Sequence, residues 1–393
     1  MIDPQKIRRL FPILKNPNLI YLDAAASAQK PQMVIDAVAN FLKTKYSNIH
    51  RGAHFLGDAA TDDFEKARGK IAKFFGAGSP REMVFGKNAT EMINLIANTF
   101  DFRAGDKILL TRAEHHANLI PWLIAAKKHD LKIHFLEIDK NREILLDEKK
   151  FRGAKIVAFP HISNVLGVEN PAAKICALAR KAGAISLVDA CQSAPHLPID
   201  VAAMGCDFLV ASIHKMYGPS GVGVLFGRKD LLKKMPPFLG GGEMIRAVSF
   251  SDFTPNEIPH RFEAGTPPIE NVVGAGAAID FLENLKMSEI EKYGAEISRF
   301  AFEKLSEIPE IKIVSGKNAN GLVSFSCREK QNYDLSDFLS DRGICVRVGH
   351  HCAEPLHELL GVKTTVRASF AVHTEKREIE ILATEIKNFF AEK

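Results

Sequence analysis

Cysteine is scarce in the 393-residue sequence, and no two cysteines are spaced as a CxxC pair. Six cysteines in a chain of this length do not form a disulfide framework. They indicate a reducing compartment, so we expect the protein in the cytoplasm. The six are Cys176, Cys191, Cys206, Cys327, Cys345 and Cys352.

Long apolar runs are also absent, since no segment approaches the ~18 consecutive apolar residues of a membrane-spanning helix. Residues 1–23 lack an apolar stretch followed by a small-residue cleavage site, so we expect no secretory signal and no membrane association. Charge of one sign is scarce as well: 52 Lys and Arg stand against 47 Asp and Glu, a net charge of +5 without a basic run. We therefore expect no nucleic-acid partner.

Short apolar segments rich in β-branched residues alternate with helical patterns through the first two thirds of the chain. Strands that are apolar on both faces and separated by helices indicate an α/β fold with a large, mostly parallel sheet covered by helices. Ligands of such sheets gather at the carboxyl ends of the strands, so the residues directly after each strand are the candidates for a site. The expected strands are 82–85, 106–111, 132–136, 154–159, 184–188, 208–211 and 223–226, and the helical segments include 90–98, 122–129 and 172–182.

The last third of the chain predicts a second, smaller α+β domain. Residues 236–268 are rich in glycine and proline, and a helical pattern follows over 269–308. No repeat or Ser/Gly linker separates the two parts, so we expect packed domains. The remaining expected elements are strands at 311–314, 322–325 and 344–348 and helices at 354–360 and 375–393.

Asp189 and Lys215 follow two of the expected strands. Asp189 could hold a protonated ring nitrogen, or it is a capping or turn residue. Lys215 lies between an apolar strand and a Gly-rich turn, where desolvation favours the neutral amine that attacks an aldehyde; a surface lysine on a loop is the alternative. Together the two residues supply the groups that pyridoxal phosphate (PLP) requires, an amine for its aldehyde and an acid for its ring nitrogen.

Thr90 and His115 also follow expected strands. Thr90 opens a helix whose unpaired amides suit a phosphate, although a Gly/Thr helix start is a common feature. His115, beside His116, could lie flat on a cofactor ring and relay protons, whereas an isolated histidine pair is more often at the surface or on a metal. Both residues are therefore candidates for contact with PLP.

Cys352 precedes the expected helix 354–360 and has histidines and an arginine nearby, which stabilise a thiolate. Most cysteines are buried hydrophobes, but the polar neighbours argue against that interpretation here. His350, His351, Cys352 and His357 could also bind zinc, although three adjacent ligands are awkward for a tetrahedral site, and we predict no metal. Arg347 and Arg367 could bind a substrate carboxylate, or form surface ion pairs.

Motifs spread over nearly the whole chain carry a family resemblance. They are YLDAAASAQKP (Tyr21–Pro31), HRGAH (His50–His54), EHHANLIPW (Glu114–Trp122), SNVLG (Ser163–Gly167), VDACQ (Val188–Gln192), SIHKMYGPSGVGVL (Ser212–Leu225), GGGEMI (Gly240–Ile245), RFEAGTPP (Arg261–Pro268) and RVGHHCAEPL (Arg347–Leu356). In this order they resemble the Suf-type, or group II, cysteine desulfurases of the class V aminotransferase superfamily, which are close relatives of selenocysteine lyases. The compact Arg-x-Gly-His-His-Cys-Ala form favours group II over group I.

The resemblance implies a homodimer of PLP fold type I with its active site at the dimer interface. It implies an N-terminal arm (1–20) on the small domain, a PLP-binding large domain (21–280) and a small domain (281–393) with the nucleophilic cysteine. The implied catalytic residues are Lys215 as the Schiff-base lysine, Cys352 as the sulfur acceptor and His115 as the group stacked on the ring. The other implied residues are Thr90, Asp189, Gln192, Ser212, His214 and the partner subunit's Thr266 for PLP, and Asn164, Arg347, Arg367, His50 and Arg51 for the substrate.

The implied activity converts L-cysteine to alanine and leaves a persulfide on Cys352, which a sulfur-acceptor protein of the Suf system takes up for iron–sulfur cluster assembly. Selenocysteine lyase is the alternative activity, and a dormant scaffold is a second alternative. The sequence departs from the family pattern at Ala89, where many relatives have a second Thr, and at Val348 and Cys191. Of these, Ala89 removes a phosphate hydroxyl, so backbone amides must suffice there.

Overall fold

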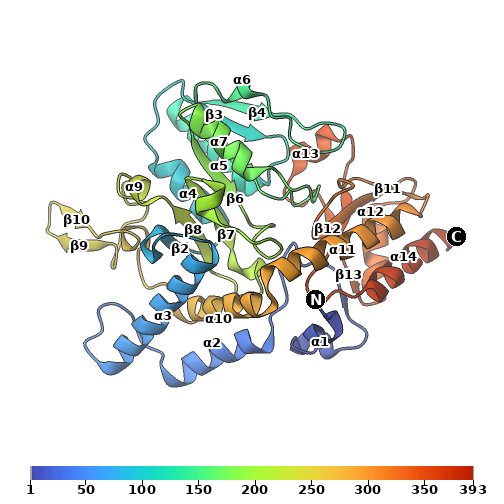
Figure 1. Ribbon diagram of the computed structural model, residues 1–393, viewed down its shortest axis with the longest axis horizontal. Coiled ribbons are helices and arrows are strands. Elements are labelled where there is room, and N and C mark those ends of the chain that lie inside the picture. The colour runs from blue at the N-terminus through green and yellow to red at the C-terminus, as the bar shows by residue number, and fades with distance from the viewer. Residues whose placement is uncertain (1, 393) are drawn as a thin grey trace.

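The protein, described over residues 2–392 by a computed structural model, has a seven-stranded sheet at the centre of its larger part (Figure 1). All neighbouring strands run parallel except β8, which is antiparallel to both β2 and β7. Each strand overlaps an expected one, so the prediction of a mostly parallel sheet is confirmed. In spatial order the strands are β2 (Met83–Gly86), β8 (Gly223–Gly227), β7 (Phe208–Ser212), β6 (Ile185–Asp189), β5 (Ala154–Pro160), β3 (Lys107–Thr111) and β4 (Lys132–Leu136).

Apolar cores cover both faces of this sheet, because successive side chains of a strand point to opposite faces. Leu109 of β3 belongs to the core that includes α3, α7 and α10, whereas Ile108 and Leu110 belong to the core that includes α4 and α5. This two-sided burial explains why the strands are apolar throughout. The helices of this part are α2 (Gln32–Thr44), α3 (Phe55–Phe74), α4 (Ala89–Thr99), α5 (Ile120–His129), α6 (Glu148–Phe151), α7 (Ala172–Lys181), α8 (Val201–Met204), α9 (Lys229–Leu232) and α10 (Ile269–Leu285).

A four-stranded antiparallel sheet of order β11-β12-β15-β14 forms the smaller part, with helices against it (Figure 1). The N-terminal segment packs on this part: β1 pairs with β13, and Arg8 of α1 forms an ion pair with Glu378 at 2.7 Å. The elements are α1 (Pro4–Arg8), β1 (Ile20–Tyr21), α11 (Met287–Ser306), β11 (Ile311–Ile313), β12 (Leu322–Cys327), α12 (Asn332–Ser340), β13 (Ile344–Cys345), β14 (Arg347–Gly349), α13 (Glu354–Leu359), β15 (Thr365–Ser369) and α14 (Lys376–Ala391).

The structure adds to the expected elements and divides one of them. The helical pattern over 269–308 forms two helices, α10 and α11, because Lys286 between them has a left-handed backbone with φ of 65°. The loop-rich region contains a hairpin, β9 (Ile245–Val248) with β10 (Phe253–Pro255), which extends from the body in Figure 1. The expected terminal helix ends at Ala391, and its predicted last residue, Lys393, lies outside the described residues. Within residues 2–392, no helix is both long and apolar enough to cross a membrane.

Candidate active site

A cavity of about 250 Å³ opens where β5, β6 and β7 end, and residues of the small sheet form another of its walls. It brings together Lys215 from the large sheet and Cys352 from the loop after β14. Ligands of α/β sheets bind at the carboxyl ends of the strands, and the cavity lies at this predicted place. The predicted site residues on its walls are Thr90, His115, Asn164, Asp189, Gln192, Ser212, His214, Lys215, Arg347, Cys352 and Arg367.

Lys215 ends a short 3₁₀ turn, Ile213–Lys215, that directly follows β7. The turn is fastened by Lys30, whose Nζ donates to the carbonyl oxygens of His214 (3.0 Å) and Ala28. Burial lowers the pKa of Lys30 to about 8. Lys215 itself is half-buried, so its amine faces the cavity from a braced backbone.

Asp189 is the last residue of β6 and is buried. Its Oδ1 accepts the N–H of Cys191 at 2.9 Å, so the other carboxylate oxygen is available to a ring N–H. Gln192 Nε2 donates one hydrogen bond to the carbonyl of Ala25 at 2.9 Å, and its second N–H can donate to a ligand. The departure at Cys191 places a buried thiol 3.8 Å from Ser212 Oγ, and burial raises the pKa of that thiol.

The start of α4 forms an anion cradle beside Ser212. The N–H of Ala89 donates to Ser212 Oγ at 2.9 Å, and Asn88 caps the helix by accepting the N–H of Glu91. Gly223 permits the approach of β8, because a Cβ there would lie 2.3 Å from the carbonyl carbon of Asn88. Helix N-terminal amides attract phosphate, so the cradle, Asp189 and Lys215 fit the phosphate, ring nitrogen and aldehyde of PLP.

His115 is half-buried between the cradle and the cysteine loop. Burial and the charge of Lys215 lower its pKa to about 4, so the ring is neutral near pH 7. Its Nδ1 accepts the N–H of Ala117 at 2.9 Å, which places the ring proton on Nε2. The preceding Glu114 is buried, and burial raises its pKa to about 8. Its carboxyl oxygens bind Thr111 and Asn118 and so fix this turn.

Arg367 of β15 is a buried cation at the cavity wall. It donates from Nη1 to the carbonyl of Asn164 at 2.9 Å and lies 3.5 Å from Asp23. Its buried Nε is without a hydrogen-bond partner in the described structure, and burial lowers its pKa to about 10. Arg347 lies 3.9 Å from the same Asp23, whose pKa burial raises. An incoming carboxylate would complete the bonding of Arg367.

Cys352 is exposed in a turn with an unusual backbone. It and His351 have φ values of 56° and 50°, and each left-handed non-glycine residue costs about 1–2 kcal/mol. His357 Nδ1 donates to the carbonyl of Ala353, so its Nε2 accepts from Thr365, which in turn accepts from His351 Nε2. Both histidine rings are therefore hydrogen-bonded to the hydroxyl of Thr365.

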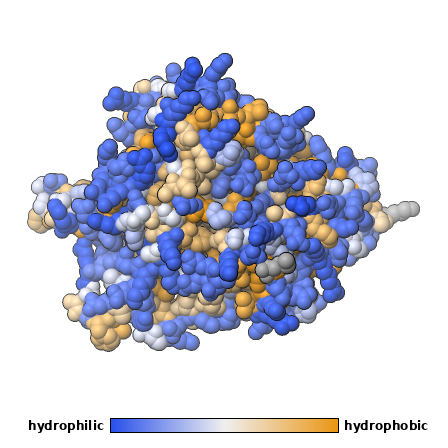
Figure 2. Space-filling model, viewed as in Figure 1, coloured by the Kyte–Doolittle hydropathy of each residue, from blue (hydrophilic) through white to orange (hydrophobic). Residues whose placement is uncertain are grey.

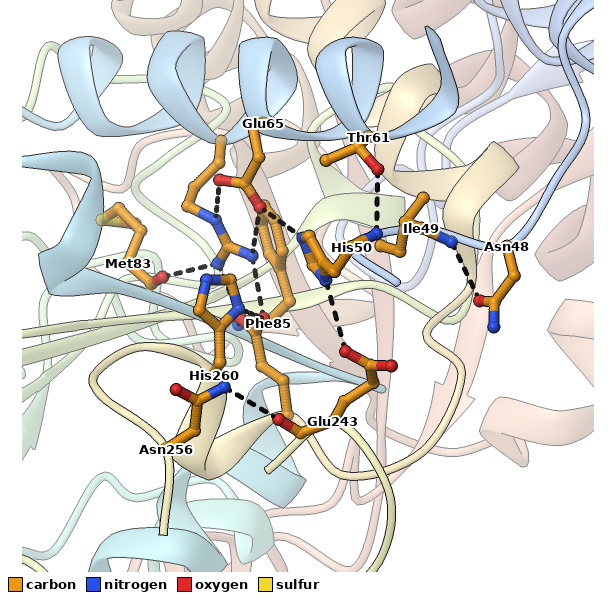
Figure 3. Close-up of polar contacts among 12 residues, drawn as sticks. Asn48, Ile49, His50, Thr61, Glu65, Met83, Phe85, Glu243, Asn256 and His260 are labelled. Atoms are coloured by element: carbon orange, nitrogen blue, oxygen red, sulfur yellow. Dashed lines mark hydrogen bonds and ion pairs between the residues drawn. The ribbon is translucent and has the colours of Figure 1, made fainter. Parts of the chain in front are cut away.

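His50, Arg51 and Thr266 do not line this cavity. His50 lies between Glu65 and Glu243 (Figure 3). Its ring nitrogens are 3.0 Å from Glu65 and 3.7 Å from Glu243, and Arg51 is 3.4 Å from Glu243. Thr266 is exposed and lines a separate pocket. Within one chain, the structure therefore does not bring these three residues to the cavity.

One group of side chains in residues 2–392 has the spacing of metal ligands, namely His50, Glu65 and His260, with ligand atoms within 4.8 Å of one another (Figure 3). Arg68 already donates to both oxygens of Glu65, at 2.9 and 3.2 Å. A guanidinium in contact with the carboxylate repels a metal cation. The cysteine-loop residues that the sequence offered as zinc ligands form no such group in the described chain.

Asp23 and Lys30 were not among the predicted site residues, and His351 was considered only as a zinc ligand, yet the three residues brace or line the cavity. Asp23 and Lys30 both lie in the motif Tyr21–Pro31, which was the available signal. Asp23 contacts Arg367, 344 residues away, and Lys30 contacts His214, 184 residues away, so no local pattern identifies these contacts.

The family model for class-V aminotransferases matches residues 20–382. A protein of Synechocystis described as a probable cysteine desulfurase is 43% identical over 95% of this chain and 93% of its own length. The solved cysteine desulfurase of Thermococcus onnurineus has a TM-score of 0.95 and 37% identity, covering 99% of this chain and 98% of its own. A cysteine desulfurase of Escherichia coli has a TM-score of 0.92 and 34% identity, covering 100% and 99%. The chain therefore belongs to the class-V aminotransferase family, within its PLP-dependent cysteine desulfurases.

Proposed function

We propose that the chain is a Suf-type cysteine desulfurase that converts L-cysteine to L-alanine and holds the sulfur as a persulfide on Cys352. The observation that carries this proposal is the shared cavity of Lys215, Arg367 and Cys352. An aminotransferase needs only the lysine, whereas desulfuration needs a second nucleophile. The Arg-x-Gly-His-His-Cys-Ala motif over 347–353 supports the Suf-type group.

PLP, when bound, supplies an aldehyde for the substrate's amino group and a ring that accepts electrons from its α-carbon. Arg367 binds the substrate carboxylate, and Asp189 holds a proton at the ring nitrogen. Lys215 Nζ removes the α-proton and later returns a proton. We assign stacking and hydrogen-bond donation to His115, because its Nδ1 is occupied by Ala117 and neither ring nitrogen is a free base.

Sulfur transfer balances without an outside oxidant. The Cys352 thiolate attacks the substrate sulfur, an S–S bond forms and the C–S bond breaks. The electron pair of that bond stays with the substrate carbon, which takes up a proton and becomes the methyl group of alanine. The sulfur is oxidised and the carbon is reduced in the same step.

Intact mass after incubation with L-cysteine tests this assignment. We expect one added sulfur on the wild-type chain and on Cys327→Ala, a matched change in β12, and none on Cys352→Ala. Alanine formation should fall at least a hundredfold in Cys352→Ala. If Cys352→Ala formed alanine at the wild-type rate, the desulfurase proposal would be overturned, and retained activity on selenocysteine alone would favour a lyase.

We propose further that the chain acts as a homodimer, divided at 1–20, 21–280 and 281–393, in the cytoplasm. Residues 1 and 393 lie outside the described structure. Large apolar side chains are exposed around α2, α3 and the hairpin, including Leu42, Phe55 and Phe250. Figure 2 shows apolar residues gathered at the lower left, where α2 and α3 meet in Figure 1. Exposed apolar groups of this kind are typical of interfaces, which supports the homodimer.

All six cysteines are free thiols, which supports the reducing environment of the cytoplasm.

Mixed dimers test whether Thr266 serves the cavity of the partner. A Lys215→Ala protomer combined with a Thr266→Ala protomer leaves one complete site only if Thr266 acts across the interface. We expect the mixture to regain about a quarter of wild-type activity, since half of the dimers are mixed and each has one such site. No recovery would show that Thr266 acts within its own chain.

The persulfide must leave Cys352, so we propose that a sulfur-acceptor protein of the Suf system docks near Cys352 and Gly240–Gly242 and delivers sulfur to iron–sulfur cluster assembly. Exposure of Cys352 supports access by a second protein. A purified acceptor with a reactive thiol should take up the labelled sulfur and raise the turnover rate. Unchanged turnover and no transfer would count against it.

A further inference from the structure

The turn that presents Cys352 is fastened to the large part of the molecule by His116. The backbone N–H of His116 donates to the carbonyl of Cys352 at 2.6 Å. Its ring Nε2 accepts the N–H of Glu354 at 3.0 Å. His116 thus makes one hydrogen bond to Cys352 and one to Glu354, on either side of Ala353.

Asn164 makes a third bond to the same turn. Its Nδ2 donates to the carbonyl of His351 at 2.7 Å, so the predicted substrate residue also holds the loop. His351 and Cys352 both have left-handed backbones, which persist only where the surroundings impose them. The three bonds supply that constraint from outside the small sheet.

His116 directly follows His115 in one turn that Glu114 fixes. The ring that we expect to stack on the cofactor and the two hydrogen bonds to the Cys352 turn therefore belong to one segment. Burial lowers the pKa of His116, which keeps Nε2 an acceptor at neutral pH.

We propose that His116 is a positioning residue for sulfur transfer, which holds the Cys352 thiol in register with the substrate on the cofactor. This rests on the proposed desulfurase function, in which Cys352 attacks the substrate sulfur. Such a residue raises the turnover rate through the effective concentration of the nucleophile and leaves substrate binding unchanged.

Two amide substitutions isolate the ring acceptor. In His116→Gln the amide oxygen reaches the place of Nε2, whereas in His116→Asn it is one bond too short. The backbone bond to Cys352 remains in both variants. The visible absorption band of bound PLP shows whether each variant folds around its cofactor.

Hydrogen exchange of peptides spanning residues 350–357 gives a readout that is independent of catalysis. We expect about fivefold faster exchange in His116→Asn, the factor for loss of one hydrogen bond, and near wild-type exchange in His116→Gln. In the same variant kcat should fall about tenfold with KM within twofold, while alkylation of Cys352 without substrate is not slowed. His116→Gln should restore kcat.

Unchanged exchange in His116→Asn would overturn the proposal, as would equal defects in the two variants. Parallel loss of alkylation would also overturn it, because reactivity and not position would then have changed. A wild-type rate of alanine formation in Cys352→Ala would overturn the desulfurase function, and hydrogen exchange would still decide whether His116 holds the turn.

Discussion

At the residue scale, the site is made of polar groups whose bonding is incomplete until a ligand arrives. Arg367 has a buried Nε without a partner, and Asp189 uses only one carboxylate oxygen on Cys191. Buried polar atoms in folded proteins nearly always find partners. Because Arg367 and Asp189 line the cavity, we expect substrate and cofactor to complete their bonding.

Replacement of Arg367 by lysine should impair substrate binding. Lysine keeps the charge but loses the planar pair of donors that grips a carboxylate. We expect KM for L-cysteine to rise at least about tenfold, since hydrogen bonds to charged groups contribute about 1.5–3 kcal/mol. Steady-state kinetics measure this. Arg342→Lys, a surface change that leaves the cavity intact, should keep the wild-type KM, and equal effects at both positions would contradict the prediction.

His115 should not titrate in the neutral range. Its pKa is lowered from 6.5 to about 4, so the ring is protonated only below about pH 4 and stays neutral above it. We expect His115→Gln to lower kcat but to keep the shape of the pH–rate profile from about pH 5.5 to 8. An inflection near pH 6.5 in the wild-type enzyme that disappears in the variant would show that His115 does exchange protons.

At the element scale, the close approach of β8 to the start of α4 builds the phosphate cradle. A Cβ at Gly223 would meet the backbone of Asn88 at 2.3–2.6 Å, and a backbone cannot swing aside like a side chain. Gly223→Ala should therefore displace the α4 amides and weaken PLP binding about tenfold or more. The visible band during dialysis measures this loss. Gly69→Ala in α3, where nothing lies within 4 Å, should retain PLP as wild type does.

The seven strands of the large sheet were predictable because each is a short, mostly apolar segment of strand length. The residues after β6 and β7 could be placed at the site for the same reason. The break at Lys286 was not predictable, since lysine is a good helix former and the sequence has no local signal for the φ of 65° at this position. β15, which carries Arg367, was not predicted. It is short and partly polar, and its pairing with β12 joins residues that are far apart in the sequence.

At the scale of the whole molecule, the site depends on how the two parts meet. Asn164 and His116 in the large part bond to the Cys352 turn, and Arg367 of the small sheet bonds to the carbonyl of Asn164. These contacts join segments about 190–240 residues apart. Local patterns therefore supply the candidate residues, and only the packed structure shows which residues brace one another.

Buried histidines should make the molecule sensitive to acid, and His373 offers a test. It is fully buried, neither ring nitrogen has a partner among the described residues, and its ring lies 4.8 Å from Phe11. Burial, with the nearby charge of Arg8, lowers its pKa from 6.5 to about 3. The unfolded chain then binds more protons below about pH 6.5, so stability falls as the pH drops through this range.

His373→Leu removes that proton-linked loss. When the pH falls from about 8 to 5.5, the unfolding free energy of wild type should drop by about 1.4 kcal/mol more than that of the variant. This is the effect expected of one histidine that takes up a proton only in the unfolded chain. Urea unfolding at the two pH values measures the difference. Glu114, whose pKa is raised to about 8, acts in the opposite direction but is present in both proteins and cancels in the comparison. His129→Leu, at the partly exposed end of α5, is the control and should lose as much unfolding free energy between the two pH values as wild type does. If His373→Leu also lost as much as wild type, the buried ring would already be protonated or solvated in the folded state.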